Sequence, residues 1–281
     1  PASEFHKLLY TKRTWRGKLL VGAVLCLFLA AGWKAAGSYL EGESVEERSP
    51  YMRQYQLLAH SLAEGRTWLE VEPDEMLHSL SNPYDYRLRS MTMENEGGTY
   101  LWDAAYYNGK YYVYFGIVPE LLFFLPYYLI TGKDLPILPV AVIISFLFIA
   151  GVWALMGTVI KRWFPETPFT VYMLLCTLIG IGCGTWDRLM MPNLHEIPIW
   201  TAMALGVWGL YFWIGSVRSD SVSLWRMGLG SFLLALISGC RPQLLLLLFL
   251  AGPVFWEPVK EGRLLRDKKA QELLCFGLPI L

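Results

Sequence analysis

The side chains best suited to chemistry in this chain are charged groups placed between apolar runs. Arg241, which precedes Pro242, carries a planar guanidinium that can form paired hydrogen bonds to a phosphate. The same side chain can also extend from the end of an apolar helix to water at a membrane interface. Because charges held at membrane depth usually face a cavity or a partner, Arg241 is a candidate phosphate contact.

A second polar link contains Arg188, His195 and Glu196. Adjacent imidazole and carboxylate groups can help to hold a divalent cation, but no third ligand stands at a useful spacing. We therefore predict no metal site and no cofactor, with a divalent cation as the remaining option. Asn193-x-x-Glu196 also has the spacing of a helix capping box, which would give Glu196 a structural role. All three charged residues are candidate substrate contacts.

A third polar stretch is dense in tyrosine and begins near Trp102 and Asp103. Asn108-Gly109 suits a type I′ turn, and tyrosines flank it on both sides, which predicts a β-hairpin. Tyrosines in such a cluster can form an interfacial aromatic belt or a platform on which a sugar ring stacks. The flanking residues are Tyr106, Tyr107, Tyr111 and Tyr112. With Trp102 and Asp103, the cluster is denser than a belt requires.

Glu120 follows Pro119 inside a largely apolar stretch, Val113–Thr131. A proline followed by an acid is a common helix start, because the acid interacts well with the positive end of the helix dipole. The alternative is that Glu120 contacts a substrate beside the hairpin. The stretch is about long enough to span a bilayer, but its central acid and its two prolines disfavour insertion. We expect a re-entrant or interfacial helix here.

These groups must be positioned by an apolar scaffold. The 281-residue chain is 54% hydrophobic and 17% charged, against about 25% charged in ordinary soluble domains. Long apolar runs must be helical in a bilayer, so the predicted fold is all-α, a polytopic transmembrane helix bundle. The net charge of zero excludes a bulk basic field for nucleic acid. The five cysteines lack the spacing of a metal site or a disulfide framework.

The positions of lysine and arginine predict the topology. The first apolar run, Leu19–Ala36, follows a basic segment that the positive-inside bias places in the cytoplasm. Five further spans are predicted at Leu138–Ile160, Phe169–Thr185, Ile199–Gly215, Leu224–Cys240 and Gln243–Trp256. The links that this scheme assigns to the cytoplasm carry Lys161 and Arg162, then Arg218 and Arg226, then a cluster from Lys260 to Lys269.

The predicted organisation has a large external loop between the first span and the bundle. An amphipathic helix over residues 51–62 is expected to lie along the membrane and to end at Gly65. The segments are a cytoplasmic N-terminus (1–18), a first transmembrane helix (19–36), the external loop (37–137), a five-helix transmembrane bundle (138–256) and a cytoplasmic basic link with the start of a further span (257–281). We expect the chain to be the N-terminal part of a longer protein.

This layout resembles the GT-C superfamily of membrane glycosyltransferases, in particular its bacterial protein mannosyltransferase-like and aminoarabinose transferase-like branch. The likeness lies in a cytoplasmic start, one span, a large external loop with a membrane-lying helix, and a bundle. Locally, residues 108–119 are similar to the family pattern D-G-x-Y-Y-x-Y-x-x-x-x-P. Arg241-Pro242 is similar to the later arginine-proline turn of the family.

The resemblance implies transfer of a sugar from a polyprenyl-phosphate donor to an acceptor at the external face of the bacterial cytoplasmic (inner) membrane. Members of the family commonly open the membrane-lying helix with D-E-x-x-Y, where the acid acts as the catalytic base or orients the acceptor. Here Tyr51 and Met52 replace that acidic pair, while Tyr55 keeps its place. The candidate catalytic bases are then Asp103 and, as the second choice, Glu47.

The remaining roles follow from the same resemblance. Arg241 and Arg188 would contact the donor phosphate, and the tyrosine hairpin, with Tyr107, Tyr111 and Tyr112, would line the sugar site. The expected partners are a polyprenyl-phosphate-linked sugar and membrane lipid. The alternative function is that of a non-enzymatic membrane protein that binds or transports a lipid-linked glycan.

Overall fold

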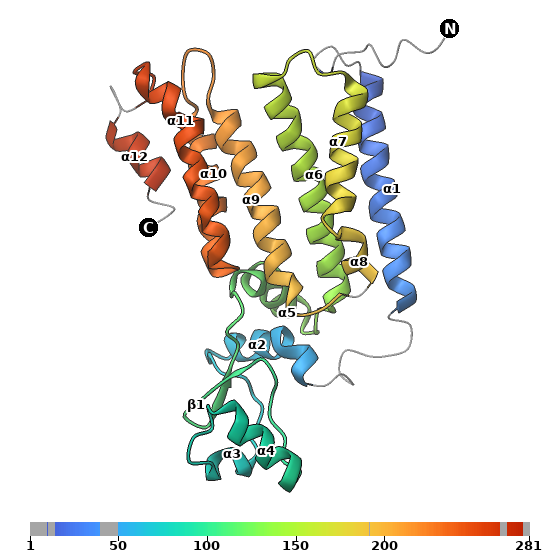
Figure 1. The fold of residues 1–281 in the computed structure, drawn as a ribbon, viewed down its shortest axis with the longest axis vertical. Coiled ribbons are helices and arrows are strands. Elements are labelled where there is room, and N and C mark those ends of the chain that lie inside the picture. Colours follow the sequence, from blue (N-terminus) through green and yellow to red (C-terminus); the bar gives the residue numbers. More distant parts are fainter. Residues whose placement is uncertain (1–9, 11–14, 40–49, 191, 265–268, 278–281) are drawn as a thin grey trace. The chain divides into compact units, whose positions relative to one another are not determined.

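The computed structural model describes residue 10 and residues 15–39, 50–190, 192–264 and 269–277. The described chain is mostly helical and divides into two compact units (Figure 1). The first, called the helical unit below, comprises Pro1–Tyr39, Leu138–Pro192 and Glu196–Leu281. The second, called the tyrosine-rich unit, comprises Leu40–Ile137 and Asn193–His195.

Three helices of the helical unit are long and apolar enough to cross a membrane. They are α6 (Ile137–Trp163), α9 (Glu196–Ser216) and a continuous helix over Pro242–Lys260. The last begins as a 3-10 segment, Pro242–Leu250, and continues as α11, Ala251–Lys260. These helices coincide with three of the predicted spans, as expected for a protein whose solvent includes the bilayer core.

The other predicted spans fall on helices with shorter apolar stretches. They are α1 (Trp15–Tyr39), α7 (Phe169–Gly182) and α10 (Leu224–Ala235), which continues as a 3-10 turn, Leu236–Gly239. The predicted span Phe169–Thr185 is interrupted because Gly184 has a φ of 74°, a left-handed conformation that commonly ends helices. The short helix α8 (Thr185–Met190) follows, and α12 covers Lys269–Gly277.

Helices α6, α7 and α9 pack through aromatic side chains that bond to backbone carbonyls. The indole Nε1 of Trp208 on α9 donates to the carbonyl oxygen of Leu147 on α6 at 2.9 Å. On the other side of α6, the hydroxyl of Tyr172 on α7 donates to the carbonyl oxygen of Trp153 at 3.0 Å. The bond from the buried Tyr172 satisfies a hydroxyl that would otherwise lack a partner among apolar side chains, and the bond from Trp208 joins α9 to α6 at a more exposed position.

Two glycines let α9 and α10 approach closely. A Cβ built on Gly230 would lie 2.8 Å from the carbonyl oxygen of Gly209, and a Cβ on Gly209 would lie 3.2 Å from the carbonyl oxygen of Gly230. Next to them, the fully buried Trp213 donates from Nε1 to Oγ of Ser231 at 3.1 Å. Small residues at a helix contact are typical of membrane proteins, where close backbone packing replaces the hydrophobic effect.

Helix α1 runs in the same direction as α7 within this unit. The N–H of Tyr10, ahead of α1, donates to the carbonyl oxygen of Thr167, just ahead of α7, at 2.9 Å. Near its other end, Gly32 of α1 lies against the side chain of Leu189 in α8. The two helices are therefore parallel, and the compartment from which they start stays a prediction.

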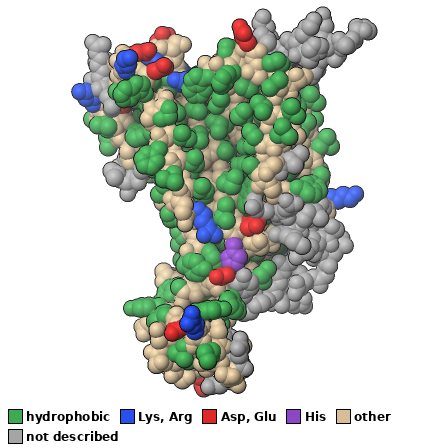
Figure 2. Space-filling view, viewed as in Figure 1, with side chains coloured by type: hydrophobic (Ala, Val, Ile, Leu, Met, Phe, Trp, Pro, Cys, Tyr) green, Lys and Arg blue, Asp and Glu red, His purple; other side chains and the backbone are tan. Residues whose placement is uncertain are grey.

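Apolar side chains also cover the outside of the helical unit. Figure 2 shows hydrophobic side chains over most of the visible face of these helices. Leu246, Phe249 and Trp256 are exposed by 68%, 79% and 69% along the Pro242–Lys260 helix. An apolar surface of this kind is suited to contact with lipid.

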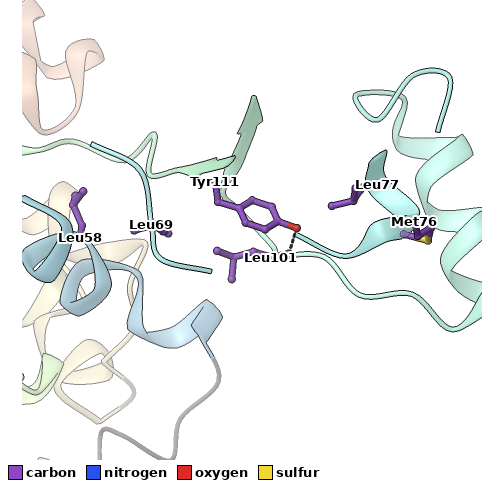
Figure 3. Close-up of a cluster of buried hydrophobic side chains, with 6 residues drawn as sticks. All are labelled: Leu58, Leu69, Met76, Leu77, Leu101 and Tyr111. Carbon is purple, nitrogen blue, oxygen red and sulfur yellow. Dashed lines mark hydrogen bonds between the residues drawn. The ribbon is translucent and has the colours of Figure 1, made fainter. Parts of the chain in front are cut away.

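The tyrosine-rich unit contains short helices around a small hairpin. Its elements are the 3-10 turn Pro50–Arg53, α2 (Gln54–Ala63), α3 (Glu75–Ser79), α4 (Tyr86–Glu96), β1 (Ala105–Tyr107), β2 (Lys110–Tyr112), the π-helical turn η5 (Glu120–Phe124) and α5 (Leu125–Thr131). Its buried apolar cluster is formed by Leu58, Leu69, Met76, Leu77, Leu101 and Tyr111 (Figure 3).

The hairpin has the turn that Asn108-Gly109 predicts. Both turn residues have positive φ, 48° for Asn108 and 73° for Gly109, and Tyr107 pairs with Lys110 across the turn. Two positive φ values define a type I′ turn, whose twist matches that of the strands. The ammonium of Lys110 lies 3.3 Å from the ring centroid of Trp68, which ties the turn to the preceding segment.

Helix α2 buries more than its predicted apolar face. Tyr55, Leu58 and Ala59 are buried, as their spacing predicts. The side chains of Gln54 and Gln56 are also buried, and their Nε2 atoms donate to the carbonyl oxygens of Trp102 and Leu135, each at 2.8 Å. The burial of these two polar side chains is not part of the predicted amphipathic pattern, and it arises because neighbouring segments cover them.

The apolar stretch after the hairpin forms a short helix. Glu120–Thr131 is one of the shorter apolar helices, and it ends where Gly132 adopts a φ of 66°. Pro119 is its N-cap residue and Glu120 lies in its first turn, which is the helix-start arrangement predicted from the sequence. The segment is too short to be one of the membrane-length helices.

Candidate functional site

Asp103 and His195, two predicted site residues, lie side by side in the tyrosine-rich unit. Nε2 of His195 is 3.2 Å from Oδ2 of Asp103, and their side chains are 33% and 41% exposed. A carboxylate beside an imidazole is a common arrangement for moving a proton, because both groups can accept or release one. The pair is open to a ligand on at least one side.

The backbone at Asp103 is held in an unusual conformation. Asp103 has a φ of 52°, which few residues other than glycine adopt, and aspartate is among those that tolerate it. Its Oδ1 atom accepts a hydrogen bond from the hydroxyl of Tyr114 at 3.1 Å. The carboxylate is therefore fixed through both oxygens, one toward Tyr114 and one toward His195.

The partner imidazole is held by an aromatic contact. The ring of Phe115 meets the ring of His195 edge to face, with centroids 4.9 Å apart. His195 belongs to the short segment Asn193–His195, which is part of the tyrosine-rich unit and immediately precedes α9. Residues from the hairpin region and from a distant link thus form one cluster.

The exposed aromatic side chains near Asp103 differ from those expected. Tyr107 is 66% exposed, as a stacking surface requires, and Trp102 and Tyr114 are exposed by 51% and 59%. Tyr112 is half-buried. Tyr111, by contrast, is 2% exposed and belongs to the apolar cluster, where its hydroxyl accepts the N–H of Leu101 at 3.2 Å (Figure 3). Tyr111 offers no surface to a sugar.

Glu120, which was predicted either to start a helix or to contact a substrate, is a buried carboxyl. Its side chain is fully buried, and neither of its oxygens has a hydrogen-bond partner among the described residues. Burial raises the pKa of Glu120 to about 9, because removal from water penalises the charged form. The group is consequently protonated near neutral pH. Nearby, Tyr55 and Phe124 stack with ring centroids 4.9 Å apart.

A second charged cluster in the same unit has no counterpart in the predictions. The Oδ2 atom of Asp134 lies 2.9 Å from Nη2 of Arg53, and its Oδ1 atom lies 2.6 Å from Nε2 of His60. The side chain of Asp134 is only 9% exposed. The ring of His60 stacks on Tyr128. These bonds join α2 to the segment after α5. The sequence separation of these residues does not predict that their side chains are in contact.

The other predicted site residues belong to the helical unit or lie outside the described residues. Arg241 is the N-cap residue of the Pro242–Leu250 segment and is half-buried. Glu196 is the first residue of α9, and Arg188 lies in α8. Glu47 lies outside the described residues. That Arg241 and Arg188 act together with Asp103 stays a prediction.

Within the described part of the chain, no group of three or more His, Cys, Asp or Glu side chains is placed to hold a metal ion. The chain matches no protein-family model, no curated protein and no solved structure.

Proposed function

We propose that this chain belongs to a membrane glycosyltransferase that transfers a sugar from a polyprenyl-phosphate donor at the external face of the bacterial cytoplasmic membrane. The observation that carries the proposal is the contact between Asp103 and His195, at 3.2 Å and open to solvent. Membrane-length helices and the resemblance in layout and motifs to GT-C enzymes support the same assignment. The polytopic bundle, with the N-terminus in the cytoplasm, is part of the proposal.

In this proposal Asp103 is the catalytic base. Its carboxylate takes the proton from an acceptor hydroxyl while the hydroxyl oxygen forms a bond to the anomeric carbon of the donor sugar. The bond from that carbon to the phosphate oxygen breaks, and polyprenyl phosphate leaves with the electron pair. His195 and Tyr114 hold the two carboxylate oxygens, which keeps one lone pair directed at the acceptor.

The donor is bound by aromatic and cationic groups. The exposed faces of Trp102, Tyr107 and Tyr114 suit stacking against a sugar ring. Arg241 and Arg188 supply guanidinium groups for the donor phosphate, whose oxygens match their paired donors. The lipid part of the donor stays in the bilayer beside the apolar helices.

The test is sugar transfer or release from radiolabelled polyprenyl-phosphate sugars by the purified chain. Asp103→Asn should lower the rate by about 10²- to 10⁴-fold, the usual contribution of a general base. Asparagine also tolerates positive φ, so the fold should be retained. Glu72→Gln, which changes an exposed carboxylate of the same unit, is the matched control and should keep the wild-type rate.

Two results would count against the proposal. If Asp103→Asn and wild type transfer sugar at the same rate, Asp103 is not the base. If wild type binds the donor without any turnover, the non-enzymatic glycan-binding alternative is favoured. Sidedness is tested separately by labelling Asn108→Cys and Arg241→Cys in a cysteine-free background with a membrane-impermeant maleimide, since the proposed site requires that both positions share one compartment.

A further inference from the structure

The helical unit contains a cavity of about 500 Å³ that is lined by four cationic side chains. They are Lys161 and Arg162 at the end of α6, Arg218 in the turn after α9, and Arg263 after α11. The same cavity is lined by Thr158, Ile214, Gly215, Val217 and Ser219. None of the residues that line it is acidic. Three separate links of the sequence therefore bring positive charge to one place.

Backbone hydrogen bonds hold two of the arginines at the cavity. Nη1 of Arg162 donates to the carbonyl oxygen of Ile214 at 3.4 Å, which joins α6 to the end of α9. Nη1 of Arg263 donates to the carbonyl oxygen of Arg218. The turn that carries Arg218 is itself closed by an antiparallel bridge between Val217 and Val222. Hydrogen bonds to the backbone therefore hold two of the four cationic side chains, and a closed turn carries a third.

Nearby acids neutralise only part of this charge. Glu261 pairs with Arg263, its Oε2 atom accepting from Nε at 2.7 Å, and Glu257 interacts electrostatically with Arg162. Among the described residues, neither Lys161 nor Arg218 forms an ion pair. Like charges that converge repel each other, and an anion in the cavity would remove that repulsion.

We infer that this cavity is a binding site for a phosphate group. Guanidinium groups form paired, charge-assisted bonds to phosphate oxygens, and lysine adds a point charge. The hydroxyl of Ser219 is a further donor on the cavity wall. The site does not include Asp103 or the other groups of the proposed transferase site, and the inference does not depend on that proposed function.

The place of the cavity suggests two sources for the phosphate. The four cations lie at or beyond the ends of α6, α9 and α11, all of which belong to membrane-length helices. A phospholipid headgroup is found at this depth, and basic pockets between helices bind anionic lipids. A free phosphate or a soluble phosphate ester has the same chemistry. The experiment below separates them.

The test uses the whole chain purified in a nonionic detergent. One arm titrates inorganic phosphate by calorimetry. The other measures thermal unfolding with added dioleoyl phosphatidylglycerol, compared with the zwitterionic dioleoyl phosphatidylcholine. The double variant Lys161→Gln with Arg218→Gln should weaken binding of the active probe at least tenfold. Lys260→Gln, an exposed lysine near the same helix ends that does not line the cavity, should leave binding unchanged.

Each outcome decides the question. Binding of inorganic phosphate that the double variant loses identifies a soluble phosphate site. Stabilisation by phosphatidylglycerol alone, lost in the double variant, identifies a lipid headgroup site. The inference is overturned if neither probe binds wild type, or if Lys260→Gln weakens binding as much as the double variant. Both altered side chains are exposed, so the double variant should fold, and its unfolding temperature without ligand checks this.

Discussion

Nε2 of His195 lies 3.2 Å from Oδ2 of Asp103, although Asp103 precedes β1 and His195 follows α5 by many positions in the sequence. Both side chains are partly exposed, so the pair contributes little to stability, about 0–1 kcal/mol. Asp103 also has a positive φ, and backbone conformations of this kind are common at functional sites, which is consistent with the role proposed for the pair.

The first prediction concerns the coupling of this pair. Asp103→Asn and His195→Gln should each lower sugar transfer, and the double variant should be no slower than the slower single variant. The reason is that residues acting as one unit have strongly non-additive effects. Steady-state transfer rates of wild type, the two single variants and the double variant together form a double-mutant cycle. Additive losses would show that the two side chains act independently.

The candidate site residues were easier to predict than their contacts. Asp103 was a candidate base implied by the family resemblance, and His195 was a candidate because it lies in a polar link between apolar runs. Their contact was not predictable, because the sequence spacing of two links says nothing about which of their side chains meet. The burial of Tyr111 was also only partly predictable. Its alternation with Tyr112 places one of the two inward, but the pattern alone does not say which.

The second prediction concerns the turn of the hairpin. Gly109→Ala should destabilise the tyrosine-rich unit by about 1–2 kcal/mol, because a side chain at a φ of 73° meets its own backbone. A Cβ there would also lie 3.3 Å from Cε1 of His78. Asn108→Gly is the matched variant and should be neutral or stabilising, since glycine adopts positive φ freely. Chemical denaturation monitored by tryptophan fluorescence compares them; equal stabilities would contradict the turn geometry.

Helix positions were predicted well wherever apolar runs were long. The helices α6, α9 and Pro242–Lys260 coincide with predicted spans because a sustained apolar run has one stable conformation in lipid. The polar contacts of α2 were not predictable. The side chains of Gln54 and Gln56 donate hydrogen bonds to carbonyl oxygens of residues far along the chain. Asp134 likewise pairs with Arg53 and His60, which are distant in the sequence. Periodicity carries no information about such partners.

The third prediction concerns the pH dependence caused by Glu120. Its pKa is raised to about 9 in the folded chain, from an ordinary value of 4.5. Between these values the unfolded chain loses the proton that the folded chain keeps, so stability falls as pH rises, by at most about 1.4 kcal/mol per pH unit. Below pH 4.5 both states are protonated and the effect vanishes.

Glu120→Gln should remove this slope, because the amide does not titrate. Thermal unfolding of the two proteins in detergent should be similar at pH 5, and the variant should unfold at a higher temperature at pH 8.5. Glu72→Gln, which alters an exposed carboxylate, should keep the wild-type slope. If the unfolding temperatures of wild type and Glu120→Gln change with pH in the same way from pH 5 to 8.5, the Glu120 carboxyl is in contact with water.

The fourth prediction concerns the contact between α9 and α10. Gly230→Ala should destabilise the helical unit by about 1–3 kcal/mol, the usual cost of overpacking. The new methyl group would lie 2.8 Å from the carbonyl oxygen of Gly209 and 3.1 Å from the backbone nitrogen of Trp213. Backbone atoms cannot move aside as a flexible side chain can, so the two helices must separate. That separation would also strain the bond from Trp213 to Ser231.

Gly252→Ala is the matched control, because a Cβ at Gly252 meets no atom within 4 Å. It should keep or slightly raise the unfolding temperature, since alanine favours a helix over glycine. Trp213 is fully buried beside the contact, so the tryptophan emission should shift to the red if the two helices separate. An unchanged emission maximum and unfolding temperature in Gly230→Ala would show that α9 and α10 are not closely packed. A red shift in Gly230→Ala but not in Gly252→Ala would locate the change at that contact, because only there does the added methyl group meet backbone.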